Sequence, residues 1–200
     1  MKGSNGSAKV DGTSFNVLVE PNTASRIPYP SLDSLSPIKH ARVFDPARKI
    51  LLNVSRMALH ASDGLWSAQA ALGRATIDAD LDHRLREMVI LRVAYLQHSD
   101  YEIFHHKAIA ANLGVTEAQQ AAILSDDLSP LAEPERALMQ FASEVILNVS
   151  PSDDALAAMR EHYSDRILFD VVVVIGSYML TARLAAVGGV AIEEQPVTGW

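Results

Sequence analysis

From Asp45 onward, apolar residues recur at the three- and four-residue intervals of an α-helix, and this periodicity limits the possible folds more than any other feature. Helix start and stop signals separate the periodic segments. A capping residue precedes proline at Asp45-Pro46 and at Ser150-Pro151, and Gly114 follows another segment where a terminating glycine is expected. We therefore predict an all-α fold, a bundle of helices packed around one core.

The predicted helices begin near residues 46, 65, 81, 100, 117, 135, 151 and 165. Asp80 is the expected N-cap of the third helix. One segment is ambiguous, because residues 171–175 are β-branched throughout and could form a buried strand. The apolar pattern continues beyond Tyr178, for longer than a strand usually runs, so we predict a buried helix there.

Residues 1–40 differ in composition from the rest of the chain. They are rich in glycine, proline and serine and show no helical period, which is typical of an extended or disordered arm. We predict two parts, an N-terminal arm over residues 1–40 and a helical domain over residues 41–200. The arm could become ordered by lying on the body or on a neighbouring subunit.

Charge and cysteine usage exclude several classes of function. The net charge of −7 argues against nucleic acid or an anionic membrane as a partner. The longest uninterrupted apolar run, residues 171–175, is too short to span a membrane, and the N-terminus has no apolar signal segment. The chain has no cysteine, which excludes thiol and disulfide chemistry. We expect a cytoplasmic protein.

The first candidate for chemistry is Glu87, which precedes the apolar run of residues 88–91. Carboxylates rarely occur in such runs unless they are paired or functional. Arg86 and Arg92 lie nearby on the same predicted helix, so a structural ion pair is an equally good explanation. Either arginine could alternatively hold a substrate carboxylate.

A denser polar group follows, over residues 97–106. Glu102 and His106 are four residues apart and therefore share a helix face, where a carboxylate beside an imidazole can transfer protons. The same spacing also occurs on ordinary solvent-facing helices. His98 could complete a metal site with these two residues, although the spacing matches no established zinc motif. Ser99 lacks the flanking glycines of a nucleophile elbow, and His105 is expected at the surface or in an interface.

Several of these pieces occur together in a known family. The residues 85–94, followed by Tyr101-Glu102, His106 and Gly114, resemble the carboxymuconolactone decarboxylase family, which shares its fold with alkylhydroperoxidase D. The resemblance extends over residues 45–190. It implies an all-α fold built around an antiparallel helical hairpin, usually assembled as dimers, trimers or hexamers.

The resemblance also implies site residues and an activity. Glu87 and His106 match the glutamate and histidine of the redox members, whereas Ser99 and Glu102 stand where the two cysteines would be. What is retained is similar to the decarboxylase branch, whose named member removes CO2 from γ-carboxymuconolactone without a cofactor. The implied catalytic residues are His106 as proton donor, Glu102 as its modulator and Glu87 as a second relay group. The implied substrate-binding residues are listed here: Tyr101, Ser99, Arg86 and His98.

The predicted function is thus a cofactor-independent, metal-free lyase acting on a small cyclic acid or lactone. Two alternatives remain open. One is a catalytically silent oligomeric scaffold or binding protein, in which Glu87, Glu102 and His106 pair with each other in a closed interior. The other is a metal-dependent enzyme of the same fold.

Overall fold

The chain folds into two compact units, each described here by itself. The computed structural model describes residues 9–10, 13–14, 25–45 and 50–199. The units are Met1–Ala70 with Arg183–Gln195, and Ala71–Ala182 with Pro196–Trp200. Half of the predicted arm, residues 1–8, 11–12 and 15–24, lies outside the described residues.

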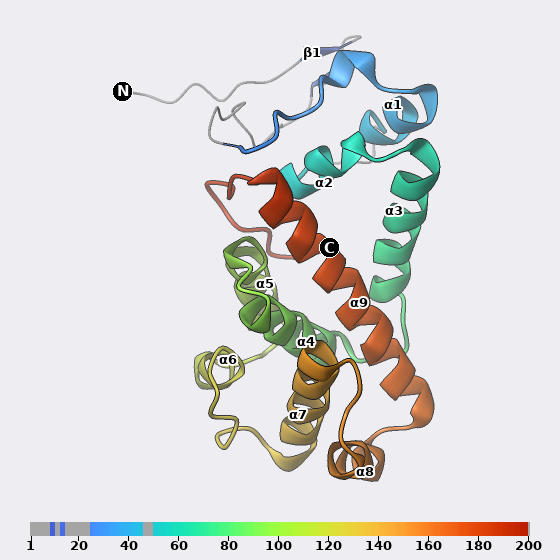
Figure 1. Cartoon of the computed structure of the whole chain (residues 1–200). Coiled ribbons are helices and arrows are strands. Elements are labelled where there is room, and N and C mark those ends of the chain that lie inside the picture. The colour runs from blue at the N-terminus through green and yellow to red at the C-terminus, as the bar shows by residue number, and fades with distance from the viewer. Residues whose placement is uncertain (1–8, 11–12, 15–24, 46–49, 200) are drawn as a thin grey trace. The chain divides into compact units, whose positions relative to one another are not determined.

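The described elements are almost entirely helical, as predicted (Figure 1). The short elements before the main helices are β1 (Lys9–Val10), β2 (Thr13–Ser14), η1 (Leu32–Ser34), α1 (Pro37–Val43), α2 (Asn53–Met57) and η2 (Ala58–His60). The remaining helices are α3 (Asp63–Ile77), α4 (His83–Leu96), α5 (Asp100–Asn112), α6 (Glu117–Ile123), α7 (Glu133–Asn148), α8 (Asp153–His162) and α9 (Asp165–Gly188). The two strands form a two-residue antiparallel ladder.

In the first unit, two helices begin at positions that differ from the predicted ones. Helix α1 begins at Pro37, inside the segment predicted to lack helices, because Pro37 follows Ser36 in the favoured first helical position. The helix predicted from Asp45-Pro46 begins later among the described residues, at Asn53. Its N-cap position is occupied by Leu52, which has no polar side chain, and the Glu193 carboxylate instead accepts a hydrogen bond from the Asn53 amide at 2.7 Å.

The second unit holds the main hydrophobic core. Helix α4 packs against both α5 and α7, and α7 packs against α8 (Figure 1). Residues 88–91 and Val93 of α4 are fully buried, because this helix is surrounded by apolar side chains on nearly every face. The two polar residues that precede this run, Arg86 and Glu87, are carried into the interior with it.

Two predicted helix caps are displaced by two residues. Helix α4 is capped by Asp82, whose Oδ1 atom accepts hydrogen bonds from the amides of Arg84 and Leu85, and not by Asp80. Asp80 instead pairs with Arg166 at the surface. Helix α8 is similarly capped by Ser152 and not by Ser150. In each case the residue two positions later along the chain has its side-chain oxygen within reach of the free amides of the first turn.

Helix α9 includes the β-branched residues 171–175, as predicted from the length of the apolar pattern. It is also long and apolar enough, by length and composition alone, to cross a membrane: its best window has a mean hydropathy of 1.8 and is 28% buried. The core helix of a soluble protein passes the same test. Val171, Val174 and Ile175 pack into the core of the second unit, whereas Val172 and Val173 are exposed, so the segment predicted as a buried helix is buried on one face only.

Candidate functional site

Glu87 is the centre of a buried hydrogen-bonded chain in the second unit. Its Oε1 atom accepts from Nε and Nη2 of Arg86 at 3.2 and 3.0 Å, and its Oε2 atom lies 2.6 Å from Nδ1 of His106. The exposed fractions of Glu87, Arg86 and His106 are 0%, 2% and 4%. The packing of α4 against α5 thus joins two segments whose residues are nineteen positions apart in the chain.

The charge state of Glu87 follows from these contacts. Burial acts to raise the pKa of the Glu87 carboxyl, but the hydrogen bonds and charges of His106 and Arg86 outweigh burial and lower this pKa. An ionised carboxylate only accepts hydrogen bonds, so the hydrogen between the two groups belongs to Nδ1 of His106. Glu87 therefore holds the imidazole in one orientation and one tautomer, with Nε2 as its other ring nitrogen.

Glu102 is in the opposite electrostatic situation. Its side chain is 2% exposed, and neither carboxylate oxygen has a hydrogen-bond partner within the described part of the chain. Burial raises the pKa of the Glu102 carboxyl to about 8, and the neighbouring Ser99 hydroxyl offsets only part of this effect. At neutral pH, Glu102 therefore carries a proton that it can donate.

The expected Glu102–His106 pair does not form, since His106 pairs with Glu87. The two residues nevertheless lie four positions apart on one face of α5. Tyr178 of α9, which entered the sequence analysis only through the length of the apolar pattern, adds an aromatic group to this site. Its ring packs edge to face against the His106 ring, with centroids 5.1 Å apart. Burial and the nearby carboxylates, Glu87 before Glu102, raise the pKa of the Tyr178 hydroxyl, so it remains a hydrogen-bond donor.

The other predicted binding residues lie around this group or away from it. Ser99 is buried at the N-cap position of α5, whereas His98 is exposed and adopts a positive φ of 53°. Tyr101 is buried and packs edge to face against His105. His105, expected at the surface or in an interface, is 2% exposed within the single chain, because the C-terminal segment covers it: the Val197 amide donates a hydrogen bond to Nδ1 of His105.

Arg92, the second arginine considered for a substrate carboxylate, has a structural role. Its Nε atom donates to the Ser143 hydroxyl at 2.8 Å, and its Nη1 atom donates to the backbone oxygens of Ile123 and Ser125. These bonds connect α4 with α7 and with the end of α6. No carboxylate is among these partners, so Arg92 joins helices and Arg86 remains the arginine of the candidate site.

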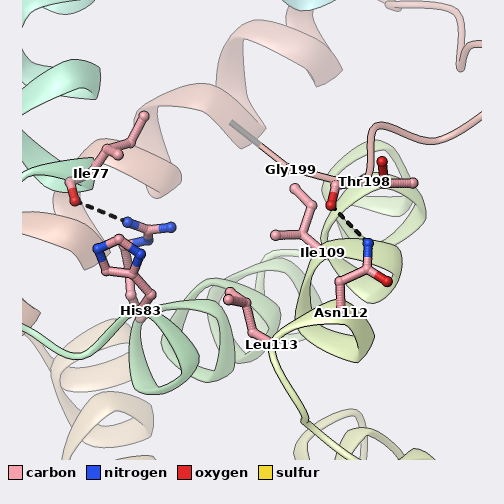
Figure 2. Close-up of a pocket in the computed structure, with 8 residues that line it drawn as sticks. Ile77, His83, Ile109, Asn112, Leu113, Thr198 and Gly199 are labelled. Carbon is pink, nitrogen blue, oxygen red and sulfur yellow. Dashed lines mark hydrogen bonds between the residues drawn. The ribbon is translucent and has the colours of Figure 1, made fainter.

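A cavity of about 230 Å³ borders the site on the side of Arg86 (Figure 2). Ile109 and Leu113 line it from α5, three and seven residues after His106, and therefore continue the helix face that carries His106. His83 of α4 and Asn112 of α5 contribute polar groups to its wall. Neither was singled out from the sequence, although His83 precedes Arg86 by three residues and thus shares its helix face.

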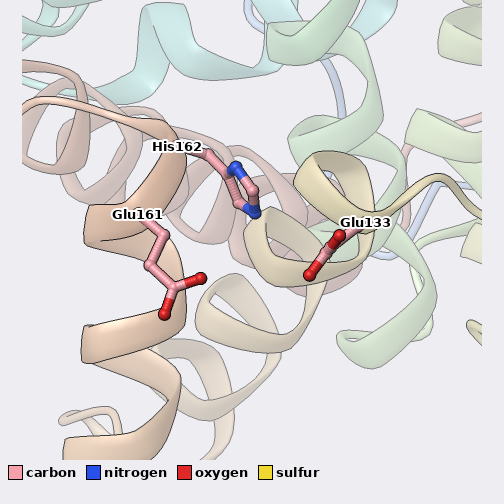
Figure 3. A group of neighbouring side chains, drawn as sticks. All are labelled: Glu133, Glu161 and His162. Atoms are coloured by element: carbon pink, nitrogen blue, oxygen red, sulfur yellow. The ribbon is translucent and has the colours of Figure 1, made fainter.

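The metal-site alternative receives no support at its predicted position. In the part of the chain that the structure describes, His98, Glu102 and His106 do not gather their ligand atoms. The group that does so is Glu133, Glu161 and His162, whose ligand atoms lie within 4.8 Å of one another (Figure 3). All three side chains are exposed at the surface, and exposed acidic groups commonly gather without binding a metal ion.

Solved structures with a similar fold indicate the structural class of this protein. A peroxidase-related protein with an alkylhydroperoxidase D core from Ralstonia eutropha is 23% identical, with a TM-score of 0.73 over 86% of this chain and 94% of its own. A peroxidase-related protein from a Silicibacter species is 18% identical, with a TM-score of 0.70 over 88% and 95%. The debrominase Bmp8, in complex with 2,3,4-tribromopyrrole, is 18% identical, with a TM-score of 0.59 over 71% and 80%. The fold is that of the alkylhydroperoxidase D-like helical proteins.

The sequence comparison finds a match to one protein family over part of the chain. A model of the carboxymuconolactone decarboxylase family matches residues 65–144, which span α4 and α5 and hence the whole Arg86–Glu87–His106 chain. The chain therefore resembles that family over 80 of its 200 residues, and it has no cysteine. The predicted resemblance and the predicted all-α fold are both confirmed. No match was found among curated proteins.

Proposed function

We propose that this protein is a cofactor-independent acid–base lyase that decarboxylates a small cyclic carboxylic acid or lactone. The observation that carries the proposal is the contrast between two buried carboxyl groups. Glu87 is held ionised between Arg86 and His106, whereas Glu102 is buried without a hydrogen-bond partner among the described residues and is protonated at neutral pH. Two acids whose environments push their pKa values in opposite directions are a common arrangement in acid–base catalysis.

The proposed reaction needs only a donor group and a proton. The bond between the substrate and its carboxylate carbon breaks, CO2 leaves, and the electron pair remains on the substrate as an enolate. Glu102 then delivers its proton to the substrate carbon. Nε2 of His106, the ring nitrogen without a hydrogen, relays a proton from water so that the site regains the one it donated. Donor groups close to the enolate oxygen lower the barrier by stabilising its charge, and the Tyr178 hydroxyl can act as such a donor.

The absence of cysteine separates this proposal from the activity suggested by the names of related structures. A thiol peroxidase needs a thiolate nucleophile and a resolving thiol, and this chain has Ser99 and Glu102 at the two matching positions. Serine cannot form the disulfide, and glutamate cannot replace the nucleophilic thiolate. The family scaffold is therefore retained with different chemistry at these two positions.

The test is CO2 release from γ-carboxymuconolactone and from a panel of lactone acids and β-keto acids. His106→Ala should abolish release while leaving the oligomeric state unchanged, and His162→Ala, which alters an exposed histidine, should leave the rate unchanged. An unchanged rate in His106→Ala would exclude the proposed role of this residue. Absence of turnover with every compound would favour the silent scaffold instead.

A further inference from the structure

The cavity that Arg86 lines is a candidate binding site for a small molecule, and Arg86 contributes a charged group to its wall (Figure 2). Its volume of about 230 Å³ lies below the roughly 300–1,000 Å³ of sites for drug-sized ligands, so it suits a molecule of one ring. Among its lining residues, Arg86 is 2% exposed, whereas His83 and Asn112 are exposed and are called its rim. All the lining residues belong to the second compact unit.

Arg86 retains hydrogen-bonding capacity on the cavity side. A guanidinium has about five N–H donors and no acceptor. Within the described residues, Nε and Nη2 donate to Glu87, and Nη1 donates to the backbone oxygen of Ile77 at 3.2 Å. Two donors, one on each Nη atom, are left without an acceptor. A buried cationic group with unused donors requires oxygen atoms from a ligand or from water.

Arg86 also shares its carboxylate partner with a second side chain. The Glu87 carboxylate is shared, because its second oxygen accepts the Nδ1 hydrogen of His106 at 2.6 Å. The arginine therefore does not have a carboxylate to itself, and an incoming anion gains charge-assisted hydrogen bonds to the two unused donors. The geometry favours a carboxylate, whose two oxygens match paired guanidinium donors better than a single-atom anion does.

The remaining walls determine what can be attached to that carboxylate. Ile77, Ile109 and Leu113 provide apolar surface on which a ring can pack. The final wall is the C-terminal segment, where the Thr198 backbone oxygen accepts a hydrogen bond from the Asn112 side-chain amide at 2.8 Å. Asn112 thus both lines the rim and fastens this wall in place.

We propose that this cavity binds the carboxylate of a small single-ring organic acid, with Arg86 as the anchor and His83 and Asn112 as rim residues that determine specificity. Binding of such an acid is argued from the cavity alone, and only the identification of the acid as the substrate rests on the proposed function. Arg86 also contacts Glu87, which orients His106, so a bound carboxylate would be connected to the acid–base group through two consecutive hydrogen-bonded pairs.

Benzoate is a suitable probe, with benzamide as its uncharged analogue of similar shape. By isothermal titration calorimetry at pH 7, the unmodified protein should bind benzoate at least about tenfold more tightly than benzamide, because charge-assisted hydrogen bonds contribute that much. Asn112→Trp, which places a large side chain at the rim, should weaken benzoate binding at least about tenfold. Ala111→Trp, an equally large change at the neighbouring exposed residue, should not alter it.

Equal binding of benzoate and benzamide, or benzoate affinity unchanged in Asn112→Trp, would overturn the proposal, as would no benzoate binding to the unmodified protein. His106→Ala separates the two proposals, because it removes a group of the proposed acid–base site, and His106 does not line the cavity. If it loses turnover and retains benzoate binding, both proposals are supported. If His106→Ala retains turnover while Asn112→Trp prevents benzoate binding, the cavity proposal is supported and the proposed role of His106 is contradicted.

Discussion

The Nδ1 atom of His106 lies 2.6 Å from the Oε2 atom of Glu87, in an interior where neither side chain is more than 4% exposed. Because Arg86 donates to the other oxygen of the same carboxylate, Glu87 is bound on both sides and remains ionised. Glu102, on the same helix face as His106, has no such partner among the described residues and retains its proton. The functional argument depends on this difference between two glutamates.

Replacing Glu87 should destabilise the protein strongly. In Glu87→Gln, Arg86 loses the charge of its partner while remaining buried, and breaking a buried ion pair in this way costs about 3–5 kcal/mol. The free energy of unfolding, measured by urea denaturation, should fall by an amount in this range. Glu117→Gln, at an exposed position in α6, should change it by less than about 0.5 kcal/mol. An equally small change in Glu87→Gln would contradict the ion-pair interpretation.

Glu102 should make stability depend on pH. The pKa of its carboxyl rises from 4.5 to about 8 on folding, so the folded protein holds a proton that the unfolded chain has released between these values. Stability is therefore fully present below the unfolded pKa and decreases as pH rises towards 8, by up to about 1.4 kcal/mol per pH unit. Glu102→Gln, which cannot titrate, should lose this slope in urea denaturation measured from pH 5 to pH 9. A slope equal to that of the unmodified protein would argue against a protonated Glu102.

The Glu102 carboxyl should also determine how the rate of turnover depends on pH. If Glu102 is the proton donor, turnover of an accepted substrate should decrease as pH rises through about 8, where the carboxyl loses its proton. Glu102→Gln should lower kcat by about a hundredfold or more and remove that decrease from the residual activity. A profile that keeps its alkaline limb in Glu102→Gln would assign the limb to another group.

The cap of α4 can be tested with a matched pair of aspartates. Asp82→Ala removes the side chain that accepts hydrogen bonds from two first-turn amides and should cost about 1 kcal/mol of unfolding free energy. Asp80→Ala removes only an exposed ion pair with Arg166 and should cost less than about 0.5 kcal/mol. The reverse order of these two effects would show that the cap is at Asp80, as the sequence alone suggested.

Two glycines should respond to alanine with opposite signs. Gly189 has a φ of +60°, and an added Cβ would lie 2.7 Å from the backbone nitrogen of Arg26, so Gly189→Ala should destabilise by at least about 1–2 kcal/mol. Gly73 lies within α3 with nothing within 4 Å of an added Cβ. Gly73→Ala should therefore stabilise by about 0.5–1 kcal/mol, because alanine favours the helix. Thermal denaturation of both variants compares the two effects directly.

The sequence by itself was sufficient for the helical class, for the end of α5 at Gly114 and for the helical state of residues 171–175, because these depend on local periodicity and backbone preference. It also placed Glu87 and His106 among the candidates. It misplaced the cap of α4, because Asp80 and Asp82 are chemically identical and only the direction of the chain decides which one reaches the free amides.

Tertiary structure decided which groups are paired. The four-residue spacing favoured a pair between Glu102 and His106, but the packing of α4 against α5 brings Glu87 to His106 and leaves Glu102 buried without a partner. Burial depends on contacts between distant segments, and a pKa depends on burial and on neighbouring charge, so neither can be obtained from spacing along one helix. Only the folded chain shows that one glutamate is the ion and the other the acid.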